Sequence, residues 1–218
     1  MWDDFLAVAA ERLALQRPFS APPPLTLLVE TPGDGGPAGR QALEDFLAAQ
    51  IESGTARDAL IAQSGQDRAR FWAYRESPYE YGRILPPVVG FDISIPIGRI
   101  DRAVREIKAD LAARFPGIVQ VWFGHLADSN LHLIATRDGI DAALKRAVEE
   151  VVYGHVARLG GSISAEHGIG RSKRDFLPLS RSRSELALMR AIKDAIDPAG
   201  ILNPGRILPT PVEVQPQE

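Results

Sequence analysis

Three of the four histidines in this chain of 218 residues fall in two short segments, and one of them follows a glutamate. His125 and His132 belong to the first segment, while Glu166 and His167 are adjacent in the second. Imidazole nitrogens and carboxylate oxygens are ligands for divalent metals, and a catalytic metal site keeps a position open. An imidazole outside the ligand set has an intrinsic pKa suited to a general base near neutral pH. The pattern predicts a metal site with the ligands His125, His132 and Glu166, and with His167 as a neighbouring base.

The first histidine segment has the pattern of a β-hairpin. Residues 118–135 form two apolar runs separated by Asp128-Ser129, and both of these residues favour turns. A two-residue loop at this point places His125 directly opposite His132, with their Cβ atoms ~5 Å apart on one face of the sheet. That spacing lets both imidazoles reach one metal. The alternative is a polar cross-strand pair that binds nothing.

The second segment contains glycines that permit a bend. In a regular strand, Glu166 and His167 point to opposite faces of the sheet. Gly168 and Gly170 allow the backbone to turn, so that both side chains can face one cavity. The alternative is a surface turn without a ligand. Two imidazoles and one carboxylate suit Zn, Mn, Fe or Co.

The elements that must position these residues follow from hydrophobic periodicity and from glycine and proline. The predicted helices span 3–17, 39–53, 64–76, 100–115, 140–159 and 181–195. The predicted strands span 25–30, 59–62, 88–96, 118–126, 130–135 and 162–166, with a loop over 31–37. The connection at Asp128 is too short for a parallel crossover, so the sheet is at least partly antiparallel. We therefore expect an α+β fold with a largely antiparallel, ferredoxin-like-type sheet and helices on one face.

The composition is that of a globular chain, with 45% hydrophobic and 24% charged residues. The net charge of −3 argues against a nucleic-acid-binding surface, which is usually basic. The chain has no cysteine, which excludes disulfides and thiolate metal sites. No apolar run reaches the ~18 residues of a membrane span, and the acidic start at Asp3 and Asp4 is unlike a signal peptide. We therefore expect a cytoplasmic protein, with a loose tail over 209–218.

Three further residues carry a charge or can titrate. Arg171 and Lys173 follow the glycine turn and are expected to lie in solvent, with contact to anionic groups as the alternative. His155 lies in a predicted helix away from the other histidines, where we expect it to be solvated or structural.

Five segments of the chain, in their order and spacing, match the motifs of one family. They are Trp72-Ala73-Tyr74-Arg75-Glu76, Phe91-Asp92-Ile93-Ser94-Ile95-Pro96, the His125 hairpin, residues 162–170 with Glu166-His167-Gly168-Ile169-Gly170, and residues 197–205 with Asn203-Pro204-Gly205. In these segments the chain resembles the C-terminal, substrate-binding domain of FAD-linked oxidases of the vanillyl-alcohol-oxidase type. Members of that family include D-lactate, D-2-hydroxyglutarate and glycolate dehydrogenases. The segments lie within residues 72–205, well over half of the chain.

The resemblance implies a function. Residues 1–208 would form the substrate- and metal-binding domain of a flavin-dependent 2-hydroxy-acid dehydrogenase, in which a hydride passes from C2 of the hydroxy acid to FAD. A divalent metal, Zn or Mn, would lower the pKa of the 2-hydroxyl group. The resemblance implies that His125, His132 and Glu166 bind the metal and that His167 is the base. It also implies that Arg75 pairs with the substrate carboxylate and that Asn203 lies near the flavin.

The chain departs from the family's pattern at three places. The hairpin turn, often Gly-Asp-Gly-Asn, is Ala127-Asp128-Ser129-Asn130 here. A polar asparagine that commonly follows the second histidine by two places is Ile134, and a lysine or similar group that often precedes the aromatic-Asp pair is Gly90. The loss of these two polar groups indicates a less polar substrate or a pocket closed by other residues. It disfavours diacids such as 2-hydroxyglutarate more than it disfavours the reaction.

The family's flavin-binding domain normally comes first, and we find no glycine-rich phosphate-binding loop that would replace it. We therefore expect an excised or truncated domain that binds no flavin and is inactive alone. Its expected partners are a small 2-hydroxy acid and a flavin-binding domain, and an oligomer is compatible with the sequence. Two alternatives stay open: a free-standing divalent-metal hydrolase that uses the same four residues, and a non-catalytic association domain with structural histidines.

Overall fold

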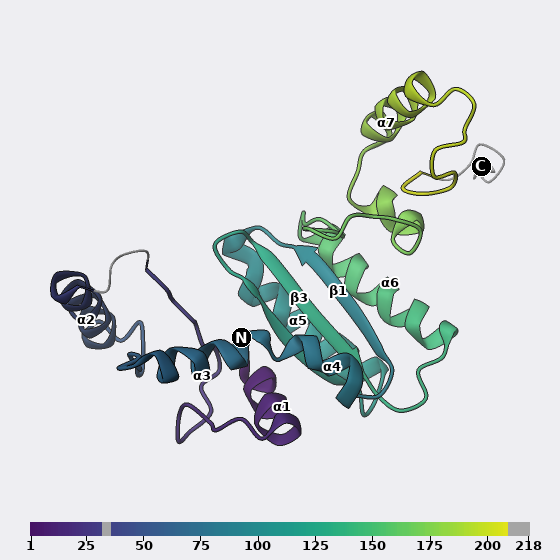
Figure 1. Ribbon diagram of the computed structural model, residues 1–218. Helices are drawn as coiled ribbons and strands as arrows, with labels where there is room; N and C mark the ends of the chain where they lie inside the picture. The colour runs from purple at the N-terminus through teal and green to yellow at the C-terminus, as the bar shows by residue number, and fades with distance from the viewer. Residues whose placement is uncertain (32–35, 209–218) are drawn as a thin grey trace. The chain divides into compact units, whose positions relative to one another are not determined.

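The computed structural model describes residues 1–31 and 36–208 (Figure 1). These residues divide into two compact units, Met1–Ile84 and a second unit that begins at Leu85. Most of the predicted loop over 31–37 and the whole predicted tail over 209–218 lie outside the described residues.

The first unit is helical. Its helices are α1 (Asp3–Leu13), α2 (Pro37–Glu52), α3 (Gly65–Glu76) and α4 (Pro78–Ile84). Three of them were predicted, and α3 begins where Ser64 caps it, because the Ser64 hydroxyl accepts a hydrogen bond from the backbone N–H of Asp67 at 3.1 Å. The short helix α4 was missed; it begins at Pro78, and proline is favoured at the first position of a helix.

Two predicted strands of the first unit are wrong. Among its described residues, segment 25–30 makes one antiparallel bridge, between Trp2 and Leu25, and segment 59–62 makes none. Leu27 and Val29 belong to an apolar run of strand length, but they are 58% and 55% exposed. A strand needs a partner for its backbone groups. An apolar run alone is therefore insufficient to predict a strand here.

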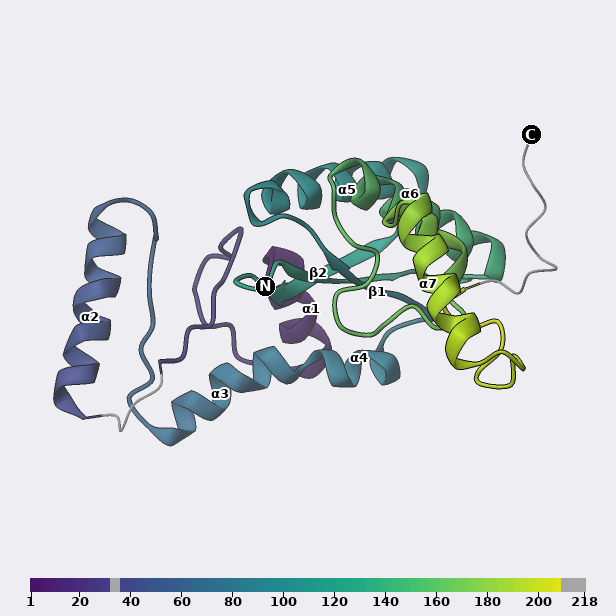
Figure 2. The ribbon, with the colours of Figure 1, turned by 90° about the horizontal axis from the view of Figure 1, so that it is seen from above.

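The second unit contains a three-stranded antiparallel sheet. Its strands are β1 (Val88–Ser94), β2 (Val119–His125) and β3 (Asn130–Thr136), in the spatial order β1-β3-β2. Its helices are η1 (Ile97–Arg99), α5 (Ile100–Arg114), α6 (Ala142–Arg158), η2 (Arg174–Leu179) and α7 (Arg183–Ile196). Helices α5 and α6 lie on the same side of the sheet (Figure 2). The predicted α+β class is confirmed.

The two faces of this sheet carry different residues. Phe91 of β1 contacts Tyr153 of α6, with ring centroids 5.4 Å apart, so the face of the sheet that carries Phe91 packs against the helices. The side chains on this face are buried and apolar: Val89, Phe91, Ile93, Trp122, Leu131, Leu133 and Ala135. Because side chains alternate along a strand, Asp92 and its register partner His132 lie on the opposite face.

The hairpin register differs from the predicted one by two residues. His125 pairs with Asn130 and Phe123 with His132, so the connection is the four-residue turn 126–129. The backbone of Ser129 is left-handed, with φ 58°. Asp-Ser is a weak signal for a two-residue loop, which favours Asn-Gly or Asp-Gly. A shift by an even number of residues preserves the face, so His125 and His132 still share one.

Helices α5 and α6 are linked by a polar cluster around His155, which is 8% exposed. Its Nε2 lies 3.0 Å from a carboxylate oxygen of Asp110 on α5, and its Nδ1 lies 2.7 Å from the guanidinium of Arg158. His155 is therefore structural, which is one of the two roles expected for it.

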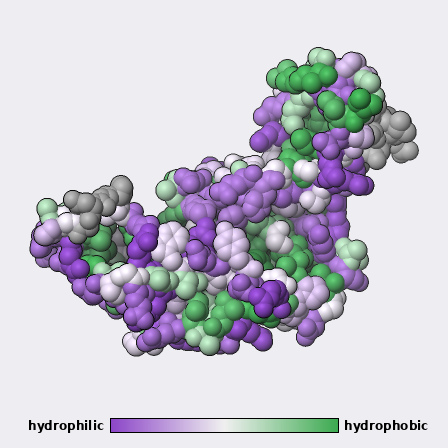
Figure 3. All heavy atoms as spheres, viewed as in Figure 1, coloured by the Kyte–Doolittle hydropathy of each residue, from purple (hydrophilic) through white to green (hydrophobic). Residues whose placement is uncertain are grey.

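Helix α7 is amphipathic and contains no buried residue. Its start is fixed by a capping box between Ser182 and Glu185. Leu188, Ile192 and Ile196 follow one another at helical spacing and are 62%, 51% and 71% exposed. Figure 3 shows hydrophobic residues gathered on the surface of α7. Within the described parts of the chain, no helix has the length and apolar character to cross a membrane.

Candidate metal and substrate site

Asp92 is the centre around which the site is built. Its side chain, in the middle of β1, is 1% exposed. The carboxylate accepts hydrogen bonds from three consecutive backbone N–H groups, those of Ala165 (3.1 Å), Glu166 (3.1 Å) and His167 (2.9 Å). Consecutive N–H groups that converge on one anion form a nest, a common way of binding negative charge. The segment that carries the predicted base is thereby wrapped around a buried carboxylate.

This wrapping explains why the predicted strand over 162–166 is wrong. Ser94 and Ser162 form one antiparallel bridge, with two backbone hydrogen bonds of 2.9 Å. Beyond Ser162 the chain leaves the sheet, because the backbone N–H groups of Glu166 and His167 turn to the Asp92 side chain. The N–H of Ala165 is shared between this side chain and the Asp92 carbonyl. Gly168 and Gly170 both have positive φ, 76° and 56°, so the predicted bend at these glycines is confirmed.

The Asp92 carboxylate is ionised at neutral pH. Burial raises its pKa, but the backbone N–H groups of His167 and Glu166, the Lys173 ammonium and the Ser164 hydroxyl outweigh burial and lower the pKa to about 2. Both oxygens are engaged, since Oδ1 accepts from Glu166 N at 3.2 Å and Oδ2 accepts from the remaining donors. A carboxylate occupied in this way organises the loop and is poorly placed to bind a metal.

Three imidazoles gather beside this loop. The ring centroid of His132 lies 5.9 Å from that of His125 and 5.8 Å from that of His167. The Nδ1 atoms of His132 and His167 lie 4.0 and 3.9 Å from the carboxylate oxygens of Asp92. His132 is buried, whereas the His167 side chain is 66% exposed. The structure therefore brings histidines from both segments together on one face of the sheet.

His132 is neutral at pH 7. Burial is the largest cause that lowers its pKa from the usual 6.5; Asp92 raises it, His167 and His125 lower it, and Glu166 raises it. The net shift is downward. The neutral imidazole, with a lone pair available, is the form that binds a divalent metal.

The nitrogen and oxygen donors at this site fit a divalent metal. The ligand atoms of Asp92, Glu166 and His167 lie within 4.8 Å of one another. The predicted trio of His125, His132 and Glu166 is not gathered within that distance in the described chain. The Glu166 side chain is exposed, and its charge is close enough to His132 to raise the pKa of that imidazole. Closing the trio therefore requires side-chain movement, and Glu166 is the exposed member of the three.

Asn130 is a buried amide beside the histidines. It is the register partner of His125 and is 2% exposed. Neither its amide oxygen nor its amide nitrogen has a hydrogen-bond partner among the described residues. A buried amide in that state calls for an explanation, and a water or ligand at the adjacent imidazoles supplies one.

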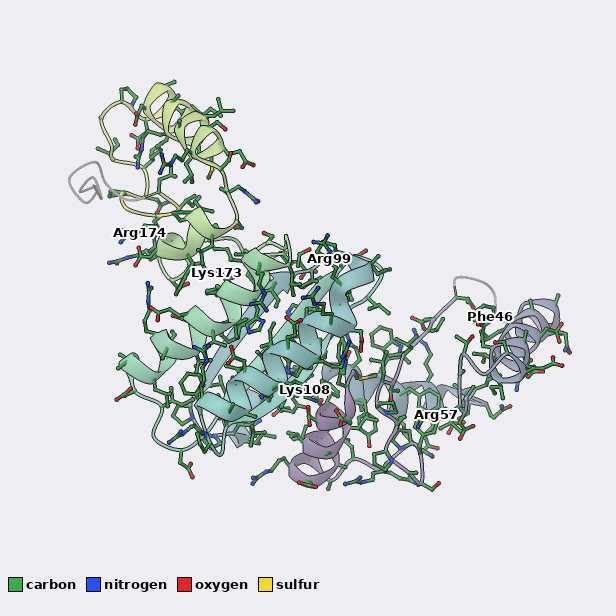
Figure 4. All side chains as sticks on the ribbon, turned by 180° about the vertical axis from the view of Figure 1, so that it is seen from behind. Phe46, Arg57, Arg99, Lys108, Lys173 and Arg174 are labelled. Carbon is green, nitrogen blue, oxygen red and sulfur yellow. The ribbon has the colours of Figure 1, made fainter. Side chains whose placement is uncertain are left out.

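Lys173 was predicted in solvent, and this prediction is wrong. The residue is 9% exposed and precedes η2 (Figure 4). Its ammonium lies 3.3 Å from Asp92 Oδ2 and 2.9 Å from the Ser164 hydroxyl. Burial lowers the pKa of Lys173, whereas the charge of Asp92 and its hydrogen bond raise it. Sequence alone offered no periodic signal for this burial; Arg171, two residues earlier, is exposed as expected.

The two remaining predicted residues lie on other elements. Arg75 is in the last turn of α3, in the first unit. Asn203 is exposed in a turn after α7, with φ 48°. That turn is tied to the glycine segment, because the backbone N–H of Ile207 donates to the carbonyl of Gly170 at 2.8 Å. Their roles toward a substrate carboxylate and a flavin stay predictions.

Two of the departures from the family's pattern face each other in the sheet. Gly90 of β1 is the register partner of Ile134, which in turn pairs with Val121 of β2. This row lies beside the row of Asp92 and His132, on the same face. A Cβ atom added to Gly90 meets no heavy atom within 4 Å. The row next to the histidines is therefore uncharged and open at Gly90.

Comparison with known proteins identifies the family to which this chain belongs. The chain matches the family model of FAD linked oxidases, C-terminal domain, over residues 1–207. It is 36% identical over 210 residues to a D-2-hydroxyglutarate dehydrogenase of Stutzerimonas stutzeri (strain A1501). This alignment covers 94% of this chain and 45% of the relative. It is also 36% identical to mitochondrial D-2-hydroxyglutarate dehydrogenases of Bos taurus and Arabidopsis thaliana, covering 86% and 89% of this chain and 34% of each relative.

The chain thus spans between about a third and just under half of the length of these relatives. The region matched by the family model takes in both histidine segments, Asp92 and Lys173. The resemblance seen in the motifs is confirmed, and the chain belongs to the family of FAD linked oxidases, C-terminal domain.

Proposed function

We propose that this chain is the substrate- and metal-binding part of an FAD-dependent 2-hydroxy-acid dehydrogenase. The observation that carries the proposal is the convergence of two histidines of the sheet, His125 and His132, with His167. His167 and Glu166 lie on a loop that a buried carboxylate holds. The family and the printed activity of the relatives support the same reaction class. The chain by itself is proposed to be inactive, since the reaction needs the flavin as hydride acceptor.

The proposed ligands of a divalent metal, Zn or Mn, are His125, His132 and Glu166. When bound, the metal would polarise the 2-hydroxyl group of the substrate, and FAD would accept the hydride from C2. His132 presents a neutral imidazole, and Glu166 supplies a negative charge, so the ligand set suits a dication. Asp92 keeps its place beneath the loop and holds the backbone of Glu166.

The proposed base is His167. Its side chain is largely exposed and lies next to the proposed ligand Glu166 in the sequence. It would take the proton of the substrate hydroxyl while the C2–H electron pair leaves for the flavin, so that the hydroxyl becomes a ketone. Arg75 would bind the substrate carboxylate in a bidentate pair, and Asn203 would border the flavin.

The direct test is reduction of the flavin in a polypeptide that carries this chain together with a flavin-binding domain. We expect bleaching of the oxidised flavin spectrum on addition of D-2-hydroxy acids, loss of that bleaching after chelation, and recovery with Zn or Mn. No bleaching with any 2-hydroxy acid would contradict the proposal. Metal-dependent hydrolysis of model esters by the chain without flavin would instead support a hydrolase.

The side chain of the preferred substrate is proposed to be uncharged. The row of Gly90, Ile134 and Val121 beside His132 offers no cation to a second carboxylate. Val121 is buried, so a substrate group can contact this row only at Gly90 and Ile134, where it gains from apolar contact and loses if it is charged. This favours hydroxy acids with short or apolar side chains over 2-hydroxyglutarate.

Introducing a cation at Gly90 tests this specificity. We expect Gly90→Lys to raise kcat/KM for 2-hydroxyglutarate relative to D-lactate by about 10-fold or more, the size of a charge-assisted hydrogen bond. The open space above Gly90 leaves room for the side chain. Gly154→Lys, an equal change at an exposed position of α6, is the control and should leave the ratio unchanged. A ratio that is unchanged in Gly90→Lys would contradict the placement of the substrate side chain over this row.

A further inference from the structure

Lys173 is buried beside the site, and neither the proposed metal site nor the proposed base uses it. Its ammonium has three hydrogens and no acceptor, and the structure gives it three acceptors: Asp92 Oδ2 at 3.3 Å, the Asp92 carbonyl at 3.4 Å and the Ser164 hydroxyl at 2.9 Å. We propose that Lys173 is a positioning residue, which locks the loop that presents Glu166 and His167 to the metal and the substrate. This inference rests on the proposed function.

The lysine connects the loop to β1. Ser164 begins the wrapped segment, and its hydroxyl lies 3.1 Å from Asp92 Oδ2 and 3.0 Å from the carbonyl of Gly168. Its single hydrogen can serve only one of these acceptors, while the hydroxyl oxygen accepts from Lys173. The ammonium therefore ties the loop to Asp92 through a hydroxyl as well as through charge.

Lys173 is itself held at a fixed place in the second unit. Its backbone N–H donates to the carbonyl of Ile169 at 3.2 Å, and its carbonyl accepts from Phe176 N at 3.0 Å. Phe176 is buried against Tyr153 of α6, with ring centroids 4.6 Å apart. The Lys173 side chain is thus held by β1, through Asp92, and its backbone is held against α6, through Phe176.

The function of such a tether is geometric. Glu166 and His167 are exposed, so their own packing does little to fix them. Their backbone N–H groups bind Asp92 Oδ2, the same oxygen that faces the ammonium. Removing the ammonium takes the charged donor away from this oxygen and from the Ser164 hydroxyl, and leaves only neutral donors to hold the loop. The ligand and the base then lose a fixed position relative to His132. Replacing a residue that holds a metal ligand in place, without binding the metal itself, typically lowers metal affinity by about 10- to 100-fold.

The test is a metal titration of the chain with Mn(II), followed by electron paramagnetic resonance. We expect Lys173→Met to weaken binding by about 10-fold or more and Lys173→Arg to restore part of that loss. Arg171→Met, at an exposed position two residues away, is the control and should bind as the unchanged chain does. The thermal midpoint of each metal-free variant is measured in parallel, because a purely structural role would lower this midpoint without changing the affinity of the folded protein.

The outcomes separate the two proposals. Equal affinity in folded Lys173→Met and in the unchanged chain would overturn the role of Lys173 and leave the proposed function standing. No Mn(II) or Zn(II) binding by the unchanged chain would overturn the proposed metal site, and the role of Lys173 with it. Should Lys173→Met fail to fold, Ser164→Ala removes one acceptor without leaving a buried charge unpaired. A several-fold loss of affinity is expected there, and an unchanged affinity would count against the tether.

Discussion

Replacement of His167 by alanine is expected to lower kcat for hydroxy-acid oxidation by about 10²- to 10⁴-fold, the usual contribution of a positioned general base. The physical reason is that the neighbouring groups that could accept a proton are already engaged. His125 and His132 are assigned to the metal, and both oxygens of Asp92 accept hydrogen bonds from the loop. His167 is the imidazole that remains for the proton. The measurement is flavin reduction in a polypeptide that also carries the flavin-binding domain.

The design of this experiment separates the base from the metal site. His167→Ala is expected to keep the metal, so its metal content should equal that of the unchanged protein while the rate falls. Replacement of the exposed Arg171 by methionine should leave both unchanged. A His167→Ala rate within a few-fold of the unchanged enzyme would show that the base lies elsewhere.

Replacement of Asp92 by alanine is expected to cost about 3–5 kcal/mol of folding free energy, as breaking a buried ion pair typically does. The change leaves the buried Lys173 ammonium without its carboxylate and three consecutive backbone N–H groups without their acceptor. Urea denaturation of the metal-free chain measures the loss. The double change Asp92→Ala with Lys173→Met should recover part of it, because no lone charge then stays buried. Asp138→Ala, at an exposed position, should change the stability by less than about 0.5 kcal/mol.

The same carboxylate makes the metal-free chain sensitive to acid. The pKa of Asp92 is about 2 in the folded chain and 3.8 as the usual value. Between these values the unfolded state binds more protons, so the contribution of Asp92 is complete above about pH 4 and is lost as the pH falls toward 2. The loss amounts to about 2 kcal/mol. It should be absent from Asp92→Asn, and an equal decline in that variant would assign the acid sensitivity to other groups.

The hairpin shows how much of the site local sequence determines. The apolar runs around His125 and His132 predict both strands, and the two-residue error in register preserves the face that they share. Loop length was the uncertain quantity, because Asp128-Ser129 favours a turn without fixing its type. The pairing of distant segments was harder. Leu27 and Val29 lie in an apolar run of strand length, yet no strand pairs with them in the described chain.

The glycine segment shows where sequence reasoning stops. The glycines predict a bend, and both have the expected positive φ. What orients Glu166 and His167, however, is Asp92, some seventy residues earlier in the chain. One signal was present: a carboxylate in the middle of an apolar strand is rarely buried without partners. Lys173 gave no such signal, because nothing local distinguishes a buried lysine after a glycine turn from a solvated one.

The most direct test of the central claim is the metal content of the chain after stripping and reloading with Zn or Mn, measured by mass spectrometry beside His132→Ala. His132 is the buried imidazole between His125 and His167, so its removal should open the ligand set while the exposed groups stay. The expected result is about one metal per chain, lost in the variant. Equal metal content in both proteins, or none in the unchanged chain, would contradict a metal site at these histidines.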